Sequence, residues 1–569
     1  MCGISGILGS NPKNSLIIQL MLEAQKHRGP DHTGVFYDEG YIALGHNRLS
    51  IIDLSEHANQ PFKDVSGRYI IVFNGEIYNY LELKATLKND YPFQTTSDTE
   101  VLLAMFIKYG EGCLHLLNGM FSFAIWDTLK KELFAARDRF GIKPFYYFKN
   151  QDTFIFSSEI KAIHQTGITK TPNESVWSGY FVNGSYGLPN ETFWETIHQL
   201  PAGHCLMLKN CHLTIEKWYD FVANVQQQPK IKNYQEAQAF YHDLLIDSIN
   251  LRFRADVPLG FNISGGIDSS ALLAMSLKSQ RDISKIEAFT FYTGDANYDE
   301  LPWVEPLIET YKNPLNKVLL SSKEVPTLAK FISTIQDEPY GGIPTLAYSK
   351  VFSSASKKGI KVLLDGQGMD EQLAGYDYYR LNSDATIQGL HTNPYKKQLL
   401  QPWFAENAKK NEYPKPFETP LENLQYRDLF YTKIPRALRF NDRVSMAYST
   451  ELRTPFLDYR LVEFAFSLPL EFKIKNNQGK QLLRDILSKY VSDTISYAPK
   501  RPLQTPQREW LGNELKAFVN QQIIAIQSSN YNSWFDEKAI DLEWNKYLAG
   551  DNQSSFHIWQ LVNFSLLMG

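Results

Sequence analysis

Cysteine is scarce in this sequence, with four residues among 569, at Cys2, Cys113, Cys205 and Cys211. They are too few and too scattered for a disulfide framework or a four-cysteine metal site, and this usage fits the reducing cytoplasm. Long apolar runs are also missing, since no window approaches the about 18 consecutive apolar residues that cross a membrane. The first ten residues lack the cationic flank and the long apolar core of a signal peptide.

A strong charge of either sign is absent as well. The 58 Lys and Arg residues nearly balance the 62 Asp and Glu residues, for a formal net charge of −4. Both signs are interspersed, so no basic stripe predicts binding to nucleic acid or to an anionic membrane. Apolar residues make up 43% and charged residues 21%, which is typical of a globular protein and excludes a disordered one. We expect a cytoplasmic protein with no membrane or nucleic-acid partner.

The first part of the chain predicts mostly strands with some helix. Segments 41–53, 67–80 and 120–127 are rich in β-branched and aromatic residues and are punctuated by Gly, Asn and Asp, which predicts strands. Residues 98–110 place apolar side chains at positions i, i+3 and i+4 before a glycine, which predicts a helix. Residues 211–234 are polar and lack periodicity, so we expect a linker there.

The second part of the chain alternates between strands and helices and ends in a helix-rich tail. This alternation predicts an α/β domain with a mostly parallel sheet. At about 150 residues per domain, the length allows four domains or two large ones. The patterns favour two, residues 2–210 and 235–569, joined by the linker 211–234. The expected elements of the second domain are a helix at 235–254, strands at 259–263, 286–292 and 361–365, and a helix beginning near Asp268.

Cys2 is a candidate nucleophile because of its position. It directly follows the initiator methionine and precedes the small residue Gly3. If Met1 is removed, Cys2 carries a thiol and a free α-amine. An α-amine titrates near pH ~8, so it can accept the thiol proton without a separate histidine. A Met-Cys-Gly start by itself fits an incidental cysteine equally well, so the neighbouring residues decide.

Further residues would complete a pocket that holds a free amino acid. Asn74 and Gly75, at an expected tight turn, offer a side-chain amide and a backbone N–H for an oxyanion hole. Arg48 can pair with an α-carboxylate through two hydrogen bonds, and Asp98 can hold an α-ammonium. Each residue taken singly is more often a turn residue or a solvated charge, so the prediction depends on their combination.

Six motifs in order resemble the glutaminase domain of class II glutamine amidotransferases over about 200 residues: MCGISGILG, HRGPD (27–31), RLSIID (48–53), NGEIYN (74–79), SDTE (97–100) and RDRFGIKPFYY (137–147). The resemblance implies an N-terminal-nucleophile αββα sandwich that hydrolyses glutamine to glutamate and ammonia. It implies Cys2 as the nucleophile and Asn74 with Gly75 as the oxyanion hole. The glutamine-binding residues that it implies are Arg48, Asn74, Glu76 and Asp98.

The segment FNISGGIDSSALLAM (261–275) predicts a strand, a glycine turn and the start of a helix. Glycines let backbone N–H groups approach an anion closely, and the positive end of the helix points at it. No Lys-Ser/Thr pair follows the glycines, so this is not a Walker A loop. A plain turn with a capped helix is the competing interpretation. The candidate phosphate-binding residues are Ser264, Gly265, Gly266, Asp268, Ser269 and Ser270.

The pattern SGGxDS resembles the pyrophosphate-binding loop of ATP pyrophosphatases. These enzymes activate a carboxylate or carbonyl as an adenylate and release pyrophosphate. Magnesium neutralises the phosphates and prefers carboxylate oxygens together with phosphate and water. Asp268 is one candidate ligand. Asp370, which follows the expected strand 361–365, is the second, because ligands gather at strand ends in open α/β sheets.

Further segments resemble asparagine synthetases, so the resemblance covers nearly the whole chain. They are LRFRADVPLGF before the glycine loop, YDE (298–300), DEP (337–339) and DRVSMAYSTELRTPFLD (442–458). Lys500 falls where the family has a lysine that faces the adenylate and pyrophosphate. A cation there fits the chemistry, because negative charge builds on the leaving pyrophosphate. Without the resemblance, a solvated lysine would be an equally good interpretation of Lys500.

One loop departs from the family pattern. Asparagine synthetases usually have SGEGxDE, where this chain has Asp365, Gly366, Gln367, Gly368, Met369, Asp370 and Glu371. The magnesium aspartate, Asp370, is retained, and Asp365 and Gly366 stay candidates for binding ATP or pyrophosphate. A glutamate at position 367 could take a proton from the attacking nitrogen, whereas glutamine cannot. Asp365 or Glu371 would then be the base. After Lys500, Arg501-Pro502-Leu503 replaces the aromatic residue of many relatives, and the proline stiffens the loop.

Three hypotheses follow. In the first, Cys2 releases ammonia from glutamine, and Mg-ATP activates the side-chain carboxylate of aspartate for amidation, giving asparagine, AMP, pyrophosphate and glutamate. The resemblance implies an internal ammonia passage and is compatible with a homodimer. The second hypothesis changes the acceptor to a uronic acid of a surface polysaccharide or a secondary-metabolite carboxylate, because of Asp365 and Gln367. The third is a non-catalytic relative, which is argued against by the joint retention of Cys2, Asn74, Arg48, Asp98, Asp268 and Asp370.

Overall fold

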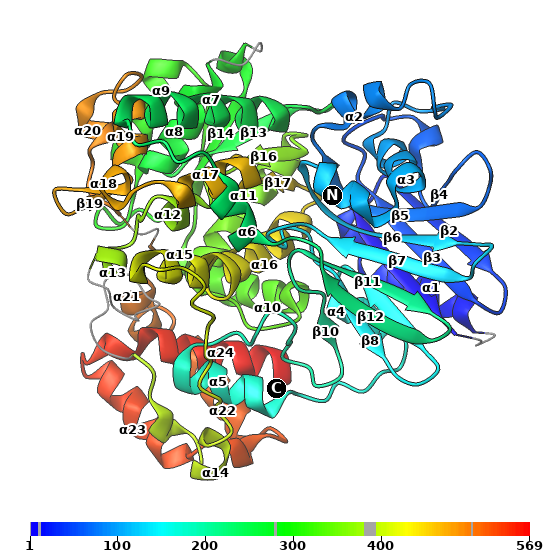
Figure 1. Ribbon diagram of the computed structural model, residues 1–569. Coiled ribbons are helices and arrows are strands. Elements are labelled where there is room, and N and C mark those ends of the chain that lie inside the picture. Colours follow the sequence, from blue (N-terminus) through cyan, green and yellow to red (C-terminus); the bar gives the residue numbers. More distant parts are fainter. Residues whose placement is uncertain (1, 10–12, 278–281, 381–393, 502–503) are drawn as a thin grey trace.

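The computed structural model describes residues 2–9, 13–277, 282–380, 394–501 and 504–569 (Figure 1). The predictions about Met1, Pro502 and Leu503 lie outside these residues. The blue and cyan strands of the amino-terminal part lie on one side of the molecule, and the green to red helices of the remainder lie on the other. No described helix is both long and apolar enough to cross a membrane.

The amino-terminal part contains two six-stranded antiparallel sheets. The first sheet has the order β10-β8-β9-β1-β3-β2, and its strands are β1 (Gly3–Leu8), β2 (His32–Asp38), β3 (Ile42–Arg48), β8 (Tyr146–Lys149), β9 (Phe154–Ser157) and β10 (His198–Gln199). The second has the order β12-β11-β7-β6-β5-β4, and its strands are β4 (Phe62–Lys63), β5 (Tyr69–Ile77), β6 (Gly119–Asp127), β7 (Glu132–Arg137), β11 (His204–Lys209) and β12 (His212–Lys217).

The two sheets pack face to face, with helices on both outer faces. Successive side chains of a strand point to opposite faces, so in β3 Leu44 packs between the sheets while Ala43 packs under the helices. The helices α1 (Asn14–Ala24) and α4 (Ile160–His164) cover the first sheet. The second sheet is covered by α2 (Tyr80–Thr86) and α3 (Asp98–Tyr109). These layers confirm the predicted αββα sandwich.

The second part is built on a five-stranded, fully parallel sheet of order β15-β14-β13-β16-β17. Phe289 and Leu363 pack on one face, whereas Ala288 and Leu364 pack on the other. Helices therefore cover both faces, which confirms the predicted α/β domain. The strands are β13 (Leu259–Asn262), β14 (Glu287–Tyr292), β15 (Leu315–Leu319), β16 (Val362–Leu364) and β17 (Glu451–Arg453), and the surrounding helices include α7 (Tyr234–Arg252), α8 (Ile267–Ser276), α9 (Leu301–Tyr311), α10 (Val325–Gln336) and α11 (Ile343–Lys357).

The tail is rich in helices, as predicted. A short helix, α12 (Met369–Gln372), follows β16 directly and carries Asp370. The main helices beyond it are α15 (Pro420–Phe430), α16 (Lys433–Met446), α17 (Tyr459–Ser467), α19 (Gln481–Leu487), α21 (Gln507–Gly512), α22 (Lys516–Gln527), α23 (Glu537–Leu548) and α24 (Ser555–Met568).

The segment 211–234, expected to be an irregular linker, contains regular structure. Strand β12 pairs with β11 at the edge of the second sheet, and helix α6 (Phe221–Gln227) buries Phe221 and Val225. The side chains of β12 are mostly exposed, so an edge strand here needs no apolar alternation. The polar sequence therefore gave no signal that predicted the strand β12.

One helix of the amino-terminal part packs into the second part of the molecule. Helix α5 (Glu174–Asn183) comes from the amino-terminal part of the chain but packs against α24 of the tail. The rings of Trp177 and Phe564 meet edge to face at 5.2 Å, and Asn563 Nδ2 donates to the Tyr180 hydroxyl at 3.1 Å. The largest core of the second part therefore contains residues from both halves of the sequence.

Candidate functional site

Cys2 lies at the start of β1, with 7% of its surface exposed. Its backbone N–H donates to Asn74 Oδ1 at 3.0 Å, and its Sγ lies 4.0 Å from the carbonyl oxygen of Leu49. Burial raises the pKa of the thiol above its usual value, so the resting side chain is neutral. A neutral thiol at this position needs a proton acceptor before it can act as a nucleophile.

Asn74 places a side-chain amide donor beside Cys2. Its Nδ2 is buried and has no hydrogen-bond partner within the described residues, while its Oδ1 holds Cys2. An unsatisfied buried amide costs free energy unless a ligand uses it, and an oxyanion is such a ligand. The expected tight turn at Asn74-Gly75 is wrong, because both residues lie inside β5 and pair with Ser122 and Phe121 of β6. A side chain at Gly75 would collide with the carbonyl oxygen of Met120, which explains the glycine.

The structure gathers the three other predicted glutamine-binding residues around this end of β5 and β3. Arg48 donates to the carbonyl oxygen of Ser55 and to Asn59 Oδ1, both at 2.8 Å, so it orders the loop after β3. The Asp98 carboxylate accepts a hydrogen bond from the backbone N–H of Ile77 at 2.9 Å, and burial raises the pKa of Asp98 to about 6. Burial also raises the pKa of Glu76 well above its usual value.

Arg28, a residue not singled out from its motif, joins the nucleophile to the second domain. Its Nε donates to the carbonyl oxygen of Cys2 at 3.0 Å. Its two terminal nitrogens donate to Asp442 at 2.9 and 3.0 Å, and one of them also donates to Glu159 at 2.8 Å. A second contact between the domains places Arg453 3.4 Å from Glu76. Cys2 and Glu76 therefore each contact an arginine that lies at the interface between the two parts.

The glycine loop lies between β13 and α8, as the sequence predicts. Gly265 has φ of +68°, a backbone conformation that favours glycine. Ser269 Oγ accepts from the backbone N–H of Ser264 at 3.2 Å and donates to the carbonyl oxygen of Gly266 at 3.1 Å. Ser270 Oγ is buried and unpartnered in the part of the chain that the structure describes. This loop can receive an anion at the amino terminus of α8.

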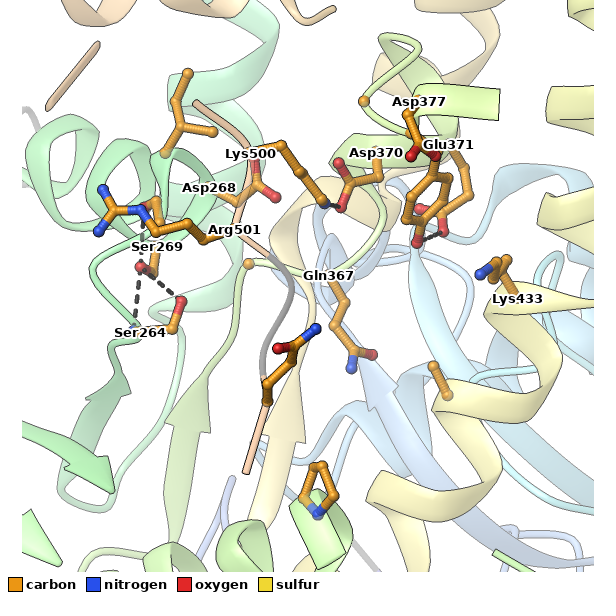
Figure 2. A pocket seen from close by; sticks show the side chains of 18 of the residues that line it. Ser264, Asp268, Ser269, Gln367, Asp370, Glu371, Asp377, Lys433, Lys500 and Arg501 are labelled. Atoms are coloured by element: carbon orange, nitrogen blue, oxygen red, sulfur yellow. Dashed lines mark hydrogen bonds and ion pairs between the residues drawn. The ribbon is translucent and has the colours of Figure 1, made fainter. Parts of the chain in front are cut away.

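Two aspartates and two lysines meet beside this loop. Lys480 Nζ lies 2.7 Å from Asp268 and 2.5 Å from Asp370, and Lys500 contacts Asp370 (Figure 2). The two ammonium groups hold the pKa of Asp370 well below its usual value despite its burial. Lys480 was missed, because nothing in its local sequence distinguishes it from a surface lysine.

The two aspartates fit a magnesium ion. One ammonium group touches both carboxylates, so their oxygens are close enough to share a cation. Among the described residues, no cluster of three or more His, Cys, Asp or Glu side chains could hold a metal ion. Two carboxylates suit magnesium, which keeps water and substrate phosphate oxygens as its other ligands.

The loop after β16 lines the same cavity, whose volume is about 1180 Å³. In the view of Figure 2, Gln367 lies between Ser264 on one side and Lys433 on the other. Its Oε1 is buried without a partner in the described ranges. Burial raises the pKa of Asp365 to about 6 and that of Glu371 to about 7. Both candidate bases therefore titrate near neutrality at the cavity wall.

Comparison with known proteins agrees with this geometry. Residues 1–219 match the family described as glutamine amidotransferase domain, and residues 241–569 match the family described as asparagine synthase. The chain belongs to the asparagine synthase family. As a member that carries the amidotransferase domain, it is an ATP-dependent, glutamine-hydrolysing ligase.

Three relatives show how far the similarity extends. Asparagine synthetase [glutamine-hydrolyzing] 3 of Bacillus subtilis is 30% identical over 541 residues, covering 88% of this chain and 86% of the relative. Asparagine synthetase [glutamine-hydrolyzing] 1 of the same organism is 29% identical, with coverages of 100% and 96%. Amidase chry2 of Gibberella zeae is 25% identical, with coverages of 96% and 95%. Both halves of the family architecture are thus present in one chain.

Proposed function

We propose that this family member makes an amide from glutamine nitrogen and a carboxylate that it activates with Mg-ATP, with aspartate as the default acceptor. The carboxylate oxygen attacks the α-phosphorus of ATP and releases pyrophosphate. Ammonia then attacks the carbonyl carbon of the adenylate, and AMP leaves. With aspartate, the products are asparagine, AMP, pyrophosphate and glutamate. The cytoplasmic location and the homodimer expected from the sequence belong to this proposal.

The observation that carries the proposal is the free Nδ2 of Asn74, buried beside Cys2 in the same chain as the carboxylate pair of the second domain. Cys2 attacks the glutamine amide, and Asn74 with the Gly75 N–H stabilises the oxyanion. Arg48, Glu76 and Asp98 bind the two ends of glutamine. Water hydrolyses the thioester and releases glutamate.

The second site would bind Mg-ATP at the cavity. Residues 264–270 receive the phosphates, and Asp268 and Asp370 would hold magnesium, which neutralises phosphate charge when bound. Lys500 and Lys480 lie where charge builds on the leaving pyrophosphate. Both lysines already contact Asp370, so a metal ion has to share or displace those contacts.

The amidation step needs a hydrogen-bond acceptor and a base. The free Oε1 of Gln367 can accept a hydrogen bond from ammonia, but it cannot take a proton. Glu371, whose pKa burial raises to about 7, is our proposed base, with Asp365 as the other candidate. Tyr376 donates to it at 2.8 Å, which orients its carboxylate.

A second acceptor class is favoured by two observations. Gln367 replaces the usual glutamate, and one full-length relative is named an amidase and not an asparagine synthetase. A uronic acid of a surface polysaccharide or a secondary-metabolite carboxylate would use the same adenylation chemistry. The roles of Cys2 and of the carboxylate pair are unchanged in this case.

One incubation tests aspartate as the acceptor. Purified protein receives Mg-ATP, amide-¹⁵N glutamine and aspartate, and mass spectrometry follows amino acids and nucleotides. Labelled asparagine with an equal amount of AMP is the expected result. Glutamate release without asparagine or AMP would remove aspartate as the acceptor and direct the assay to uronic acids. Absence of glutamate release would contradict the glutaminase assignment itself.

A further inference from the structure

Helix α16 begins with cations where helices prefer acids. Lys433 is its first residue and Arg436 its fourth, and its first turn contains no acidic side chain. The amino terminus of a helix carries partial positive charge, so a cation there is unfavourable by itself. Both residues line the large cavity. An anion bound in the cavity would compensate this arrangement.

Neither cation lies within ion-pair distance of a described carboxylate, although the more distant Asp428 and Glu371 act to raise the pKa of Lys433. In the described part of the chain, neither the Lys433 nor the Arg436 side chain makes an ion pair or a hydrogen bond, and both are half-buried. Their contacts are with aromatic rings: Lys433 Nζ lies 4.8 Å from the ring centre of Tyr376, and Arg436 lies 5.6 Å from that of Tyr186. Burial and the neighbouring Arg436 lower the pKa of Lys433 to about 8. Two under-compensated cations on one cavity wall are a binding site for negative charge.

The wall that they form is long. One face of α16 lines the cavity from Lys433 to Asn441, with Ala437 and Phe440 between them. Eight steps of 1.5 Å give about 12 Å of helix. Gln367 projects into the space between this helix and the phosphate loop in Figure 2. The acceptor side of the cavity therefore has room for a second group beyond the carboxylate that reacts.

Tyr186, from the amino-terminal part of the chain, also lines the cavity beside α16. Tyr186 follows α5, the helix that packs against α24, and its ring lies 5.3 Å from that of Phe440. Arg439, on the neighbouring face of α16, is paired with Glu338 at 3.0 Å and is thus not available to a ligand. This contrast separates the two unpaired cations from a structural one on the same helix.

We infer that the acceptor carries a second anionic group, a carboxylate or a phosphate, and that Lys433 and Arg436 bind it while the first carboxylate reacts at the adenylation site. This inference rests on the proposed function, because it names the substrate class of the same site. Aspartate satisfies it through its α-carboxylate. A uronic acid satisfies it only when a further anion, such as a phosphate, is attached.

Paired acids that differ by one anionic group test the inference. Pyrophosphate release from Mg-ATP is measured with aspartate against β-alanine, which lacks only the α-carboxylate. Glucuronic acid 1-phosphate is compared in the same way with glucuronic acid. We expect release only with the acid of a pair that has two anionic groups. Equal release with both acids of the productive pair would overturn the inference and leave the proposed function intact.

Variants locate the binding residues. Lys433→Gln and Arg436→Gln should each raise the acceptor KM by about 10- to 100-fold, the range of one charge-assisted hydrogen bond, without raising the KM for ATP. Lys516→Gln is the matched control, because Lys516 is also the first residue of a helix but is exposed and outside the cavity lining. An unchanged acceptor KM in both variants would contradict our assignment.

A binding measurement covers the case in which no acid releases pyrophosphate, which would refute the proposed function. The melting temperature is then recorded with each acid pair for the wild type and for Lys433→Gln. The inference requires that the acid with two anionic groups stabilises the wild type more than its partner does, and that this difference disappears in Lys433→Gln. If no pair shows such a difference in the wild type, the inference is refuted as well.

Discussion

Replacing Asn74 by aspartate removes a single hydrogen-bond donor from the glutaminase site. The variant keeps an oxygen that can accept a hydrogen bond from the Cys2 N–H. In the unchanged protein this nitrogen lies 3.0 Å from Asn74 Oδ1. It loses Nδ2, the buried donor that has no partner in the described ranges. The side chain is fully buried, so water cannot easily replace the missing donor. The substitution removes the proposed oxyanion-hole donor and also introduces an ionisable carboxylate, so the uncharged variant Asn74→Ala is measured beside it.

The magnitude follows from this geometry. Removal of one oxyanion-hole donor typically lowers kcat by about 10²–10³, or about 2.7–4 kcal/mol of transition-state stabilisation. Because the donor acts on the tetrahedral intermediate and not on bound glutamine, we expect the loss in kcat with little change in KM. Asn74→Ala, which also loses the contact with Cys2, should fall at least as far.

The assay is glutamate release from glutamine under saturating conditions, together with pyrophosphate release supported by ammonium salts. Ammonium-dependent activity should persist, since the second site does not use Asn74. Asn79→Asp is a suitable control, because among the described residues the Asn79 side chain bonds to the Leu116 carbonyl and the Asn118 N–H, away from Cys2. A kcat for Asn74→Asp within about threefold of the wild type, less than 1 kcal/mol, would refute the assigned role.

Three further outcomes are expected. Cys2→Ala should abolish glutamate release while ammonium-dependent amidation continues; loss of both would argue against separate sites. Lys480→Met should lower pyrophosphate release by about 10²–10³, the usual effect of removing a stabilising charge, and leave glutamate release unchanged. The acceptor KM should rise as pH increases through about 8, because burial lowers the pKa of Lys433 to that value and an anion binds its protonated form. Lys433→Gln should flatten this profile. The other charged groups that act on Lys433 are Arg436, Lys500, Asp428 and Glu371, so their titration could also change the profile.

Local pattern predicted the elements well where side chains alternate or repeat. Helix α3 begins at Asp98 and ends before Gly110, as the apolar spacing and the glycine indicate. Pattern failed at Asn74-Gly75, because an Asn-Gly pair is a strong turn signal. There, pairing with β6 continues the strand to Ile77, which only the neighbouring strand could reveal. The edge strand β12 escaped for the opposite reason, since its exposed side chains carry no signal.

Residues whose chemistry depends on their own short segment could be proposed as site residues from the sequence alone. Cys2 beside the initiator methionine and the loop at Ser264–Ser270 are of this kind, because a nucleophile with its own α-amine and a phosphate loop before a helix are both made within a few residues. The two family domains followed from motifs of this sort in order.

The placement of charge was decided by the tertiary structure. Lys480 meets Asp268 across 212 residues, and Arg28 meets Asp442 across 414. Tyr186 from the first half and Lys433 from the second share one cavity wall. No local sequence pattern predicts such contacts, because residues far apart in the chain come together only when the two halves have folded and packed against each other. The cavity wall with Lys433 and Arg436, whose side chains have no ion pair within the described residues, is also a product of that packing.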